Sequence, residues 1–425
     1  MPLRAQEVFV PGSFPRHTYI ERPENLEHSL RDAISTPGQI VSLSGPSKSG
    51  KTVLVEKVFG RDNLITITGA SIESPDEVWN RVLDWMNVPS STASTDASGW
   101  KVGGNVAKEI AVGIPSVAQI KVGGSGEGEK SGGSTETATS QRRGLAQVVA
   151  EIAKSDFVIL IDDFHYMHRD VQVEVAKSLK EAVRQDLKIV TAAVTHRGDD
   201  VVRANPELRG RVLGVNLGYW QSSELRQIAE KGFGMMHAAI PGEFVDKLVA
   251  EAAGSPQLMQ SLCLQSCFVL DVRIASLIKK TLKVDDATLR RIFEQTSAST
   301  DFRSLVDVLD VGPRTRGTER KTYKFKDGGT GDVYRAVLKG VAADPPQLSF
   351  QYDELLARTS QVCVDDSPVG SSVTSTCVQM SALSLEKFPS ERVVDWDEQK
   401  QVFDVPDPLL LFYLRWSGRL EETSS

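Results

Sequence analysis

Residues 40–52 read Ile40-Val41-Ser42-Leu43-Ser44-Gly45-Pro46-Ser47-Lys48-Ser49-Gly50-Lys51-Thr52, and this stretch decides the fold. An apolar run leads into the pattern GxxxxGK[ST], and helix-forming residues follow from Val53. This order predicts a strand, a glycine-rich loop and a helix that bind the phosphates of a nucleotide. The glycines let backbone N–H groups turn toward the phosphates, and the helix adds its positive end. The expected nucleotide contacts are Gly45, Pro46, Ser47, Lys48, Ser49, Gly50, Lys51 and Thr52.

A second stretch supplies the acidic side chains that such a loop needs. Phe157–Ile161 is apolar throughout, as in a central parallel strand, and Asp162 and Asp163 follow it. We expect Lys51 to neutralise the β- and γ-phosphates, and Thr52 and Asp162 to hold Mg²⁺. Asp163 lies where a general base polarises the attacking water, or else it supports Asp162. Many related ATPases have glutamate there, so the shorter Asp163 predicts slow hydrolysis or a shared base.

Apolar runs alternate with helical patterns from residue 39 to about 216, which predicts a parallel sheet covered on both faces. The predicted strands are Ile40–Leu43, Leu64–Ile67, Phe157–Ile161, Ile189–Val194 and Val212–Leu217. We assign residues 1–218 to this P-loop domain. A Gly/Ser-rich insertion at residues 90–140 interrupts it. The insertion is either disordered or an arm that orders on a partner or a neighbouring subunit.

Two further groups of cations belong to this domain. Thr195 and Arg197 follow the predicted strand Ile189–Val194, where a polar side chain faces the γ-phosphate and an arginine can pair with it. Arg197 could instead be solvated. Arg209 and Arg211 precede the last strand, where oligomeric ATPases carry an arginine finger that reaches a neighbour's γ-phosphate. The alternative for these two arginines is surface salt bridges.

After Val215 the apolar residues recur at helical spacing. Residues 219–310 are predicted to form a helical lid, with helices at Glu224–Gly232, Gly242–Ala253, Pro256–Leu270 and Ala287–Val308. Residues 311–425 are predicted to form a winged-helix domain. Its three helices are expected at Asp332–Ala343, Phe350–Val362 and Val373–Leu385, and its two wing strands at 392–395 and 401–405.

Composition limits the partners and the compartment. The net charge is −7, so no global charge favours nucleic acid, although Arg314, Arg316, Arg320, Lys321, Lys324 and Lys326 form a local basic stretch. The N-terminus does not resemble a signal peptide, and no apolar run reaches the length of a membrane span. Four cysteines in a chain of 425 residues make no disulfide framework. We therefore expect a cytoplasmic protein that does not bind membranes.

Taken together, these motifs resemble the STAND branch of AAA+-type ATPases, the signal-transducing switches that include NACHT and NB-ARC proteins. The resemblance covers roughly residues 18–270. Tyr19-Ile20-Glu21-Arg22 looks like the opening motif of the family, which places Arg22 near the adenine. Thr195-His196-Arg197 is similar to its sensor motif. Gly254-Ser255-Pro256 is similar to its Gly-x-Pro motif, whose proline, here Pro256, approaches the nucleotide.

The same resemblance extends weakly to the C-terminus, where residues 403–416 look like the end of a bacterial or archaeal winged helix. It implies an ATP-controlled transition from a closed to an open form, and a homo-oligomer. STAND proteins usually carry an effector domain before the ATPase and sensor repeats after it. Neither is found here, so both are expected to be separate polypeptides.

Three functions follow as hypotheses. The first is an ATP-dependent regulatory switch that controls a separate effector, and its placement in bacterial antiphage defence is by analogy alone. The second is a DNA-acting ATPase that resembles replication initiators or transposition regulators. It is less favoured because residues 271–425 carry slightly more acidic than basic side chains. The third is an ATP-binding scaffold that does not hydrolyse, which rests on the short Asp163.

Overall fold

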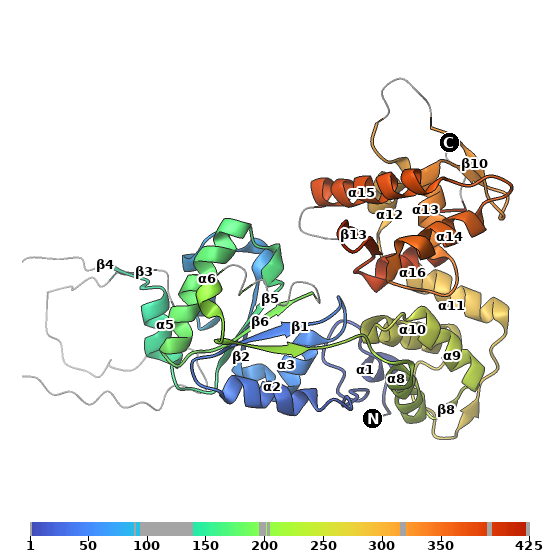
Figure 1. Cartoon of the computed structure of the whole chain (residues 1–425). Helices are drawn as coiled ribbons and strands as arrows, with labels where there is room; N and C mark the ends of the chain where they lie inside the picture. Colours follow the sequence, from blue (N-terminus) through green and yellow to red (C-terminus); the bar gives the residue numbers. More distant parts are fainter. Residues whose placement is uncertain are drawn as a thin grey trace, which may run out of the picture.

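The structure is a computed structural model. It describes residues 2–88, 91–93, 139–194, 201, 205–314, 320–388 and 393–421. Most of the predicted insertion at 90–140 and the predicted sensor residues Thr195 and Arg197 lie outside these residues. The chain forms three parts (Figure 1): a nucleotide domain built on a sheet, a helical lid, and a C-terminal domain that lies on the lid.

The nucleotide domain contains a five-stranded parallel sheet in the order β2-β5-β6-β1-β7. The strands are β1 (Ile40–Ser44), β2 (Leu64–Thr68), β5 (Val158–Asp162), β6 (Lys188–Ala193) and β7 (Val212–Asn216). The strand that precedes the glycine-rich loop therefore lies between the last two strands, as in AAA+-type P-loop ATPases. This arrangement confirms the predicted fold class.

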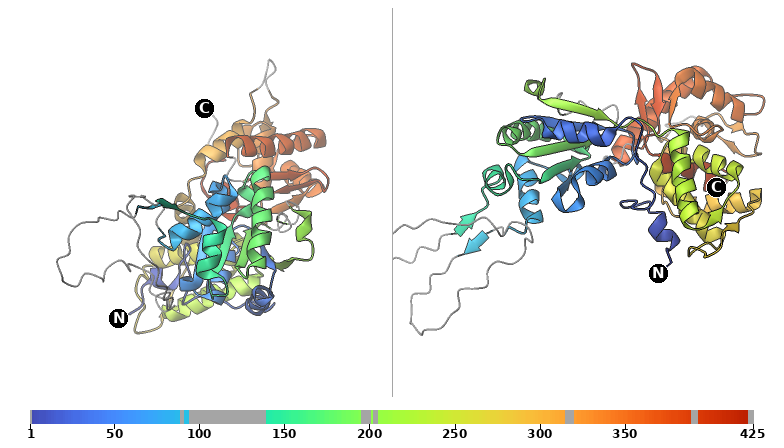
Figure 2. Two further views of the ribbon diagram at one scale, coloured as in Figure 1. Left: turned by 90° about the vertical axis from the view of Figure 1, so that its left-hand side faces the viewer. Right: turned by 90° about the horizontal axis from the view of Figure 1, so that it is seen from below.

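Helices cover both faces of the sheet (Figures 1 and 2) because its strands alternate apolar side chains between the two sides. Val158 and Leu160 pack with α2 (Leu26–Ser35) and α3 (Lys51–Phe59). Ile159 and Ile161 belong to the opposite cluster. That cluster includes α4 (Pro75–Trp85), α5 (Leu145–Ile152) and α6 (Arg169–Arg184). The sequence analysis did not predict α2. A short antiparallel pair, β3 (Ser91–Ala93) with β4 (Thr139–Gln141), joins the two ends of the insertion.

The lid is a helical cluster that also includes the N-terminus. Its elements are α8 (Ser222–Met235), α9 (Gly242–Glu251), α10 (Pro256–Val269), α11 (Asp286–Ala298) and the parallel pair β8 (Ala238–Ala239) and β9 (Lys280–Thr281). The short helix α1 (Ala5–Val8) packs into the same core. Phe9 lies directly on Gly232, where a Cβ atom would come within 2.2 Å of the ring. The first residues thus pack with the lid, although the sequence analysis grouped them with the nucleotide domain.

The C-terminal domain has the winged-helix architecture that was predicted. Its helices are α12 (Arg303–Val311), α13 (Val333–Ala342), α14 (Tyr352–Val362), α15 (Gly370–Lys387) and α16 (Pro408–Trp416). Its antiparallel sheet has the order β12-β14-β13, formed by β12 (Ser349–Gln351), β14 (Val402–Asp404) and β13 (Asp395–Asp397). A second small pair joins β10 (Tyr323–Lys324) to β11 (Thr330–Gly331). None of the described helices is long and apolar enough to cross a lipid bilayer.

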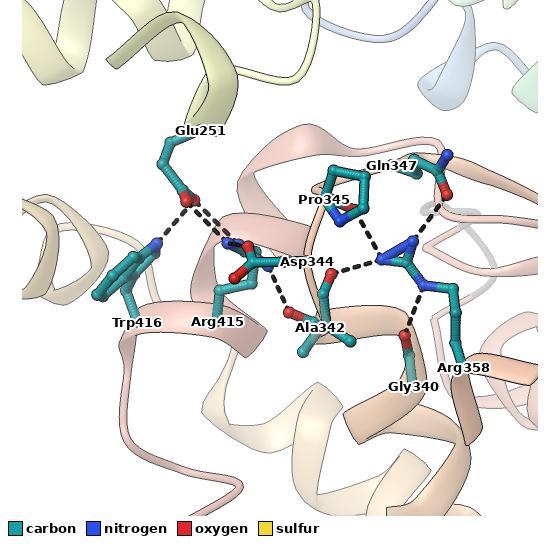
Figure 3. A network of polar contacts seen from close by, with 10 residues as sticks. Glu251, Gly340, Ala342, Asp344, Pro345, Gln347, Arg358, Arg415 and Trp416 are labelled. Atoms are coloured by element: carbon teal, nitrogen blue, oxygen red, sulfur yellow. Dashed lines mark hydrogen bonds and ion pairs between the residues drawn. The ribbon is translucent and has the colours of Figure 1, made fainter. Parts of the chain in front are cut away.

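Two helices connect the lid and the C-terminal domain. The helical block predicted at 287–308 is split into α11 and α12, and α12 adds Leu305 and Leu309 to the C-terminal core. From the other side, α16 packs its aromatic side chains on α11, with the rings of Phe293 and Trp416 4.6 Å apart. Glu251 of α9 also accepts hydrogen bonds from Arg415 and Trp416 of α16 (Figure 3). The lid and the C-terminal domain are therefore joined by both apolar and polar contacts.

Candidate nucleotide-binding site

The glycine-rich loop lies between β1 and α3, at the carboxyl edge of the sheet. Lys48 and Gly50 take positive φ values of 60° and 91°, which turn the chain sharply into α3. Gly45 is required for a different reason, because a Cβ atom there would lie 2.6 Å from the carbonyl oxygen of Leu217. The local geometry therefore explains two of the glycines in the pattern, and the helix N-terminus faces the loop.

Lys51 folds back over the loop. Its Nζ donates hydrogen bonds to the carbonyl oxygens of Gly45 (3.0 Å) and Pro46 (2.9 Å). Burial lowers the pKa of Lys51, while the nearby carboxylates of Asp162 and Asp163 oppose that shift. The phosphates of a nucleotide would replace two neutral carbonyls with charged oxygens, which are stronger partners for an ammonium group.

Thr52 and Asp162 meet although 110 residues separate them. The Thr52 hydroxyl donates to Asp162 Oδ2 at 2.6 Å, and Asp162 Oδ1 accepts from the backbone N–H of Asp163 at 3.0 Å. Both side chains offer hard oxygen ligands beside the phosphate loop. Mg²⁺ prefers oxygen ligands and takes one or two from protein, with phosphate and water completing its octahedron. The residues present therefore fit a Mg²⁺ ion that arrives with a nucleotide.

Asp163 adopts a left-handed backbone conformation, with φ of 56°, where the chain leaves β5 for a short 3-10 turn at Phe164–Tyr166. Gly69 packs against this turn, since a Cβ atom on Gly69 would lie 2.6 Å from the Asp163 carbonyl oxygen. Burial, and secondly the charge of Asp162, raise the pKa of Asp163 above its usual value. A carboxylate with a raised pKa beside the phosphate loop is suited to accept a proton from water.

These groups line one cavity of about 900 Å³, close to the upper end of the size range of small-molecule sites, about 300–1,000 Å³. All three parts of the molecule contribute to its wall. The nucleotide domain supplies the loop and Asp162, the lid supplies Pro256 and Gln257, and the C-terminal domain supplies Asp407 and Leu409. The N-terminal segment, including Val10, closes a further side. All of these parts therefore surround the space in which a nucleotide would bind.

Arg22, predicted to lie near the adenine, lines the cavity but points its donors at the lid. Its Nε donates to Glu224 Oε1 at 3.2 Å and its Nη1 to the carbonyl oxygen of Gly218 at 3.1 Å. Its guanidinium lies 5.5 Å from the ring centre of Trp220. The Trp220 indole N–H donates to the carbonyl oxygen of Ser49 in the phosphate loop, at 2.9 Å. Trp220 thus links the loop to the lid, and no sequence motif marked it.

The Gly-x-Pro motif brings the lid to the cavity. Gly254 has φ of 79°, the Ser255 hydroxyl caps α10 by accepting from the backbone N–H of Leu258, and Pro256 lines the cavity at the first position of that helix. One turn later, Gln260 accepts from the backbone N–H of Val10 (3.1 Å) and donates to Thr18 (2.8 Å). Gln260 therefore fixes the N-terminal segment over the cavity, which the sequence analysis did not anticipate.

The predicted arginine finger, Arg209 and Arg211, lies at the amino ends of the parallel strands, whereas the phosphate loop lies at their carboxyl ends. Arg209 is exposed and Arg211 is partly exposed, just before β7 begins. The carbonyl oxygen of Arg211 accepts from the backbone N–H of Ile40, which starts β1. The length of β1, about 16 Å for five residues, separates this edge from the loop. Neither arginine can serve the nucleotide of its own chain. The predicted sensor residues Thr195 and Arg197 are not described, but Val194 next to them lines the cavity.

The basic stretch at residues 314–326 is partly neutralised by its own C-terminal domain. Arg320 pairs with Asp332 at 2.7 Å, and Lys321 pairs with Asp366. Arg314, Lys324 and Lys326 are exposed. This stretch therefore offers fewer free charges to a phosphate backbone than its composition indicates.

Comparisons with known proteins show a similar fold in solved structures but no match in sequence. No protein-family model and no curated protein matches the sequence. Solved structures of similar arrangement include Cdc6p from Pyrobaculum aerophilum, with 12% identity, 98% of each chain covered and a TM-score of 0.43. The Orc2 protein of Aeropyrum pernix has 11% identity, 98% coverage of each chain and a TM-score of 0.47. A Walker-type ATPase of Pyrococcus abyssi has 13% identity and a TM-score of 0.49, with 93% of this chain and 96% of that chain covered.

Proposed function

We propose that this chain is an ATP-binding and slowly ATP-hydrolysing regulatory switch of the STAND type, which controls a separate partner protein. The observation that carries the proposal is the shared cavity. The phosphate loop, the lid residue Pro256 and the C-terminal residue Asp407 all line it. A nucleotide that contacts three parts at once can bias how they sit relative to one another, provided that ATP and ADP contact them differently.

The residues at the cavity divide the work of hydrolysis. Lys51 binds the β- and γ-phosphates once it leaves the carbonyls of Gly45 and Pro46. Thr52 and Asp162 would hold Mg²⁺, which would supply positive charge beside the phosphate oxygens. Asp163 orients the attacking water and takes its proton.

We expect Asp163→Asn to lower the rate of ATP hydrolysis by about 100-fold or more, the usual contribution of a general base, while ATP still binds. Asp162→Asn should instead raise the Mg²⁺ concentration needed for tight ATP binding, because it removes a charged ligand beside Thr52. Phosphate release and calorimetry at several Mg²⁺ concentrations measure the two effects. An Asp163→Asn protein that hydrolyses ATP at the wild-type rate would assign the base to another residue. A wild type that binds ATP but releases no phosphate would instead make the chain a scaffold.

Assembly of the switch is expected to depend on Arg209 and Arg211, because their edge of the sheet faces away from their own cavity. A guanidinium that reaches a neighbour's γ-phosphate makes the assembled form bind ATP more tightly. By linkage, ATP then favours assembly by the same free energy. We expect a non-hydrolysable ATP analogue to increase the oligomer fraction of wild type in mass photometry, and Arg209→Ala/Arg211→Ala to remove that increase.

The matched control is Arg290→Ala/Arg303→Ala, which removes two exposed arginines outside the nucleotide domain. If all three proteins assemble equally, Arg209 and Arg211 are surface charges that do not contribute to the interface. If the wild type stays monomeric in the presence of the analogue, the proposal that nucleotide binding drives self-assembly is refuted.

The partner of the switch follows from the resemblance to STAND proteins, and its place in antiphage defence is proposed on the same ground. Genes next to this one that encode a nuclease, a TIR domain or a protease would support it, and co-purification of that product with the ATP-bound protein tests it directly. A DNA-acting role has less support, because Arg320 and Lys321 are already paired with carboxylates of their own domain.

A further inference from the structure

The connection from the nucleotide domain to the lid is a short segment, residues 217–221, that leads from β7 into α8. Its backbone is held by groups from both parts. Arg22 of the nucleotide domain donates to the carbonyl oxygen of Gly218 at 3.1 Å. On the lid side, the backbone N–H of Trp220 donates to the carbonyl oxygen of Gly254 at 3.3 Å. The segment is therefore a fixed hinge rather than a free linker.

The side chains around this hinge are also held in place. Arg22 and Glu224 are both buried, and Arg22 Nε lies 3.2 Å from Glu224 Oε1. The second oxygen of that carboxylate accepts from the backbone N–H of Gln221, where α8 begins, at 2.6 Å. The Arg22 guanidinium lies 5.5 Å from the ring centre of Trp220. The Trp220 ring thus lies beside a buried ion pair that joins the start of α8 to the nucleotide domain.

The indole of Trp220 fixes one peptide group of the phosphate loop. Its N–H donates to the carbonyl oxygen of Ser49 at 2.9 Å. That carbonyl belongs to the planar trans peptide between Ser49 and Gly50, so its direction also sets the direction of the Gly50 N–H, which points the opposite way. The Gly50 N–H lies at the N-terminus of α3 and donates to no group in the part of the chain that the structure describes. It therefore remains available to an anion in the cavity.

We propose that Trp220 is a positioning residue for the nucleotide phosphates, and that it couples their binding to the position of the lid. With the lid placed as it is here, the indole keeps the Ser49–Gly50 peptide oriented and the Gly50 N–H available. A movement of α8 away from the loop would withdraw the indole, and this peptide would be free to turn. By linkage, a nucleotide that uses the Gly50 N–H favours the present position of the lid by the same free energy.

The contact differs from those of Lys51 in what a nucleotide does to it. Lys51 leaves the carbonyl oxygens of Gly45 and Pro46 when it binds phosphate. The Trp220 indole binds a different carbonyl, that of Ser49, and its N–H is already satisfied there. The loop therefore exchanges one set of contacts on nucleotide binding and keeps the one that ties it to the lid. This inference rests on the proposed function only in requiring that the cavity binds a nucleotide.

The affinity for ADP tests the positioning role without any contribution from hydrolysis. Trp220→Phe keeps an aromatic ring beside Arg22 and removes the N–H. ADP affinity in calorimetry should therefore fall about fivefold, the usual net effect of one hydrogen bond. The matched control is Trp79→Phe, because the Trp79 indole donates to Ser178 at 2.7 Å within the same domain and does not line the cavity. This control should lower the unfolding temperature and leave ADP affinity unchanged.

Amide hydrogen exchange tests the coupling to the lid. In the wild type, saturating ADP should slow exchange in the first two turns of α8. Trp220→Phe at saturating ADP should show less of this slowing, because the site is equally occupied and only the indole contact is missing. Trp79→Phe should show the same slowing as the wild type, since its effect on stability does not involve the hinge.

A second variant covers the case in which Trp220→Phe does not fold. Benzothienylalanine at position 220, in which sulfur replaces the indole N–H, removes the same donor and keeps the shape of the ring. Wild-type ADP affinity in a folded Trp220 variant would overturn the proposal, and so would an equal loss of affinity in Trp79→Phe. Weaker ADP binding with undiminished slowing in α8 would overturn the coupling to the lid. A wild type that binds no ADP would instead refute the proposed function itself.

Discussion

Replacing Lys51 with alanine is expected to weaken ATP binding by about 100-fold or more without unfolding the protein. The loss corresponds to about 3 kcal/mol, the upper end of the net contribution of a hydrogen bond to a charged group. The fold should survive because the ammonium group contacts two loop carbonyls, those of Gly45 and Pro46, rather than the core. Burial already lowers the pKa of Lys51, so its positive charge destabilises the nucleotide-free protein.

Calorimetry measures the affinity, and thermal unfolding without nucleotide measures the fold. Lys154→Ala is the matched control, since it removes a lysine from the same domain whose side chain is 80% exposed. The number of protons taken up when ATP binds gives an independent test of the role of Lys51. ATP should raise the lowered pKa of Lys51, so at alkaline pH between the free and bound pKa values binding takes up a proton. The uptake should disappear in Lys51→Ala. Wild-type affinity in this variant would refute the assignment of the loop.

The phosphate loop could be predicted because its backbone geometry demands particular residues. Gly45 lies against Leu217 and Gly50 has a positive φ, so the local structure requires glycine at both fixed glycine positions of the GxxxxGK[ST] pattern. The same holds for Asp162, because an acid that follows an apolar central strand has to emerge at the carboxyl edge of the sheet. There it meets Thr52.

The rest of the cavity wall could not be predicted, since it depends on how separate elements pack. Trp220 and Gln260 reach the site only because α8 and α10 pack with the N-terminal segment. Neither residue is part of a motif. Arg22 is a further example. The resemblance to STAND proteins places it near the nucleotide, and it does line the cavity, but its N–H groups donate to Glu224 and Gly218. The resemblance places a motif, and the packing decides which atoms its side chains contact.

The second large effect is expected at the contact between the lid and the C-terminal domain. Arg415 binds Glu251 through two bonds, Nε to Oε2 at 3.0 Å and Nη2 to Oε1 at 2.8 Å, and it also pairs with Asp344 at 2.6 Å (Figure 3). The side chains of Arg415 and Glu251 are 7% and 9% exposed. The Trp416 indole donates to the same carboxylate at 2.7 Å. Glu251 is thus a buried charge that depends on one guanidinium.

Arg415→Met should destabilise the packing of α16 on the lid by about 3–5 kcal/mol, because it leaves the Glu251 carboxylate buried without a cation. Glu251→Gln/Arg415→Met should recover part of that loss, since neither charge remains. Arg290→Ala, which breaks an exposed pair with Glu294 within α11, should leave stability almost unchanged. Chemical denaturation followed by tryptophan fluorescence measures all three.

The same variants show where the switch moves. The Glu251–Arg415 contact and the packing of Phe293 on Trp416 hold the lid and the C-terminal domain together. The nucleotide domain meets the lid through polar contacts such as Trp220 to Ser49 and Arg22 to Glu224. We therefore expect the two joined parts to move as one body when ATP binds. Arg415→Met should then expose the connection at residues 299–302 to proteolysis and uncouple the C-terminal domain from the nucleotide, with a loss of ATP affinity much smaller than that of Lys51→Ala. Unchanged proteolysis, or a loss of ATP binding as large as that of Lys51→Ala, would contradict a rigid lid and C-terminal unit.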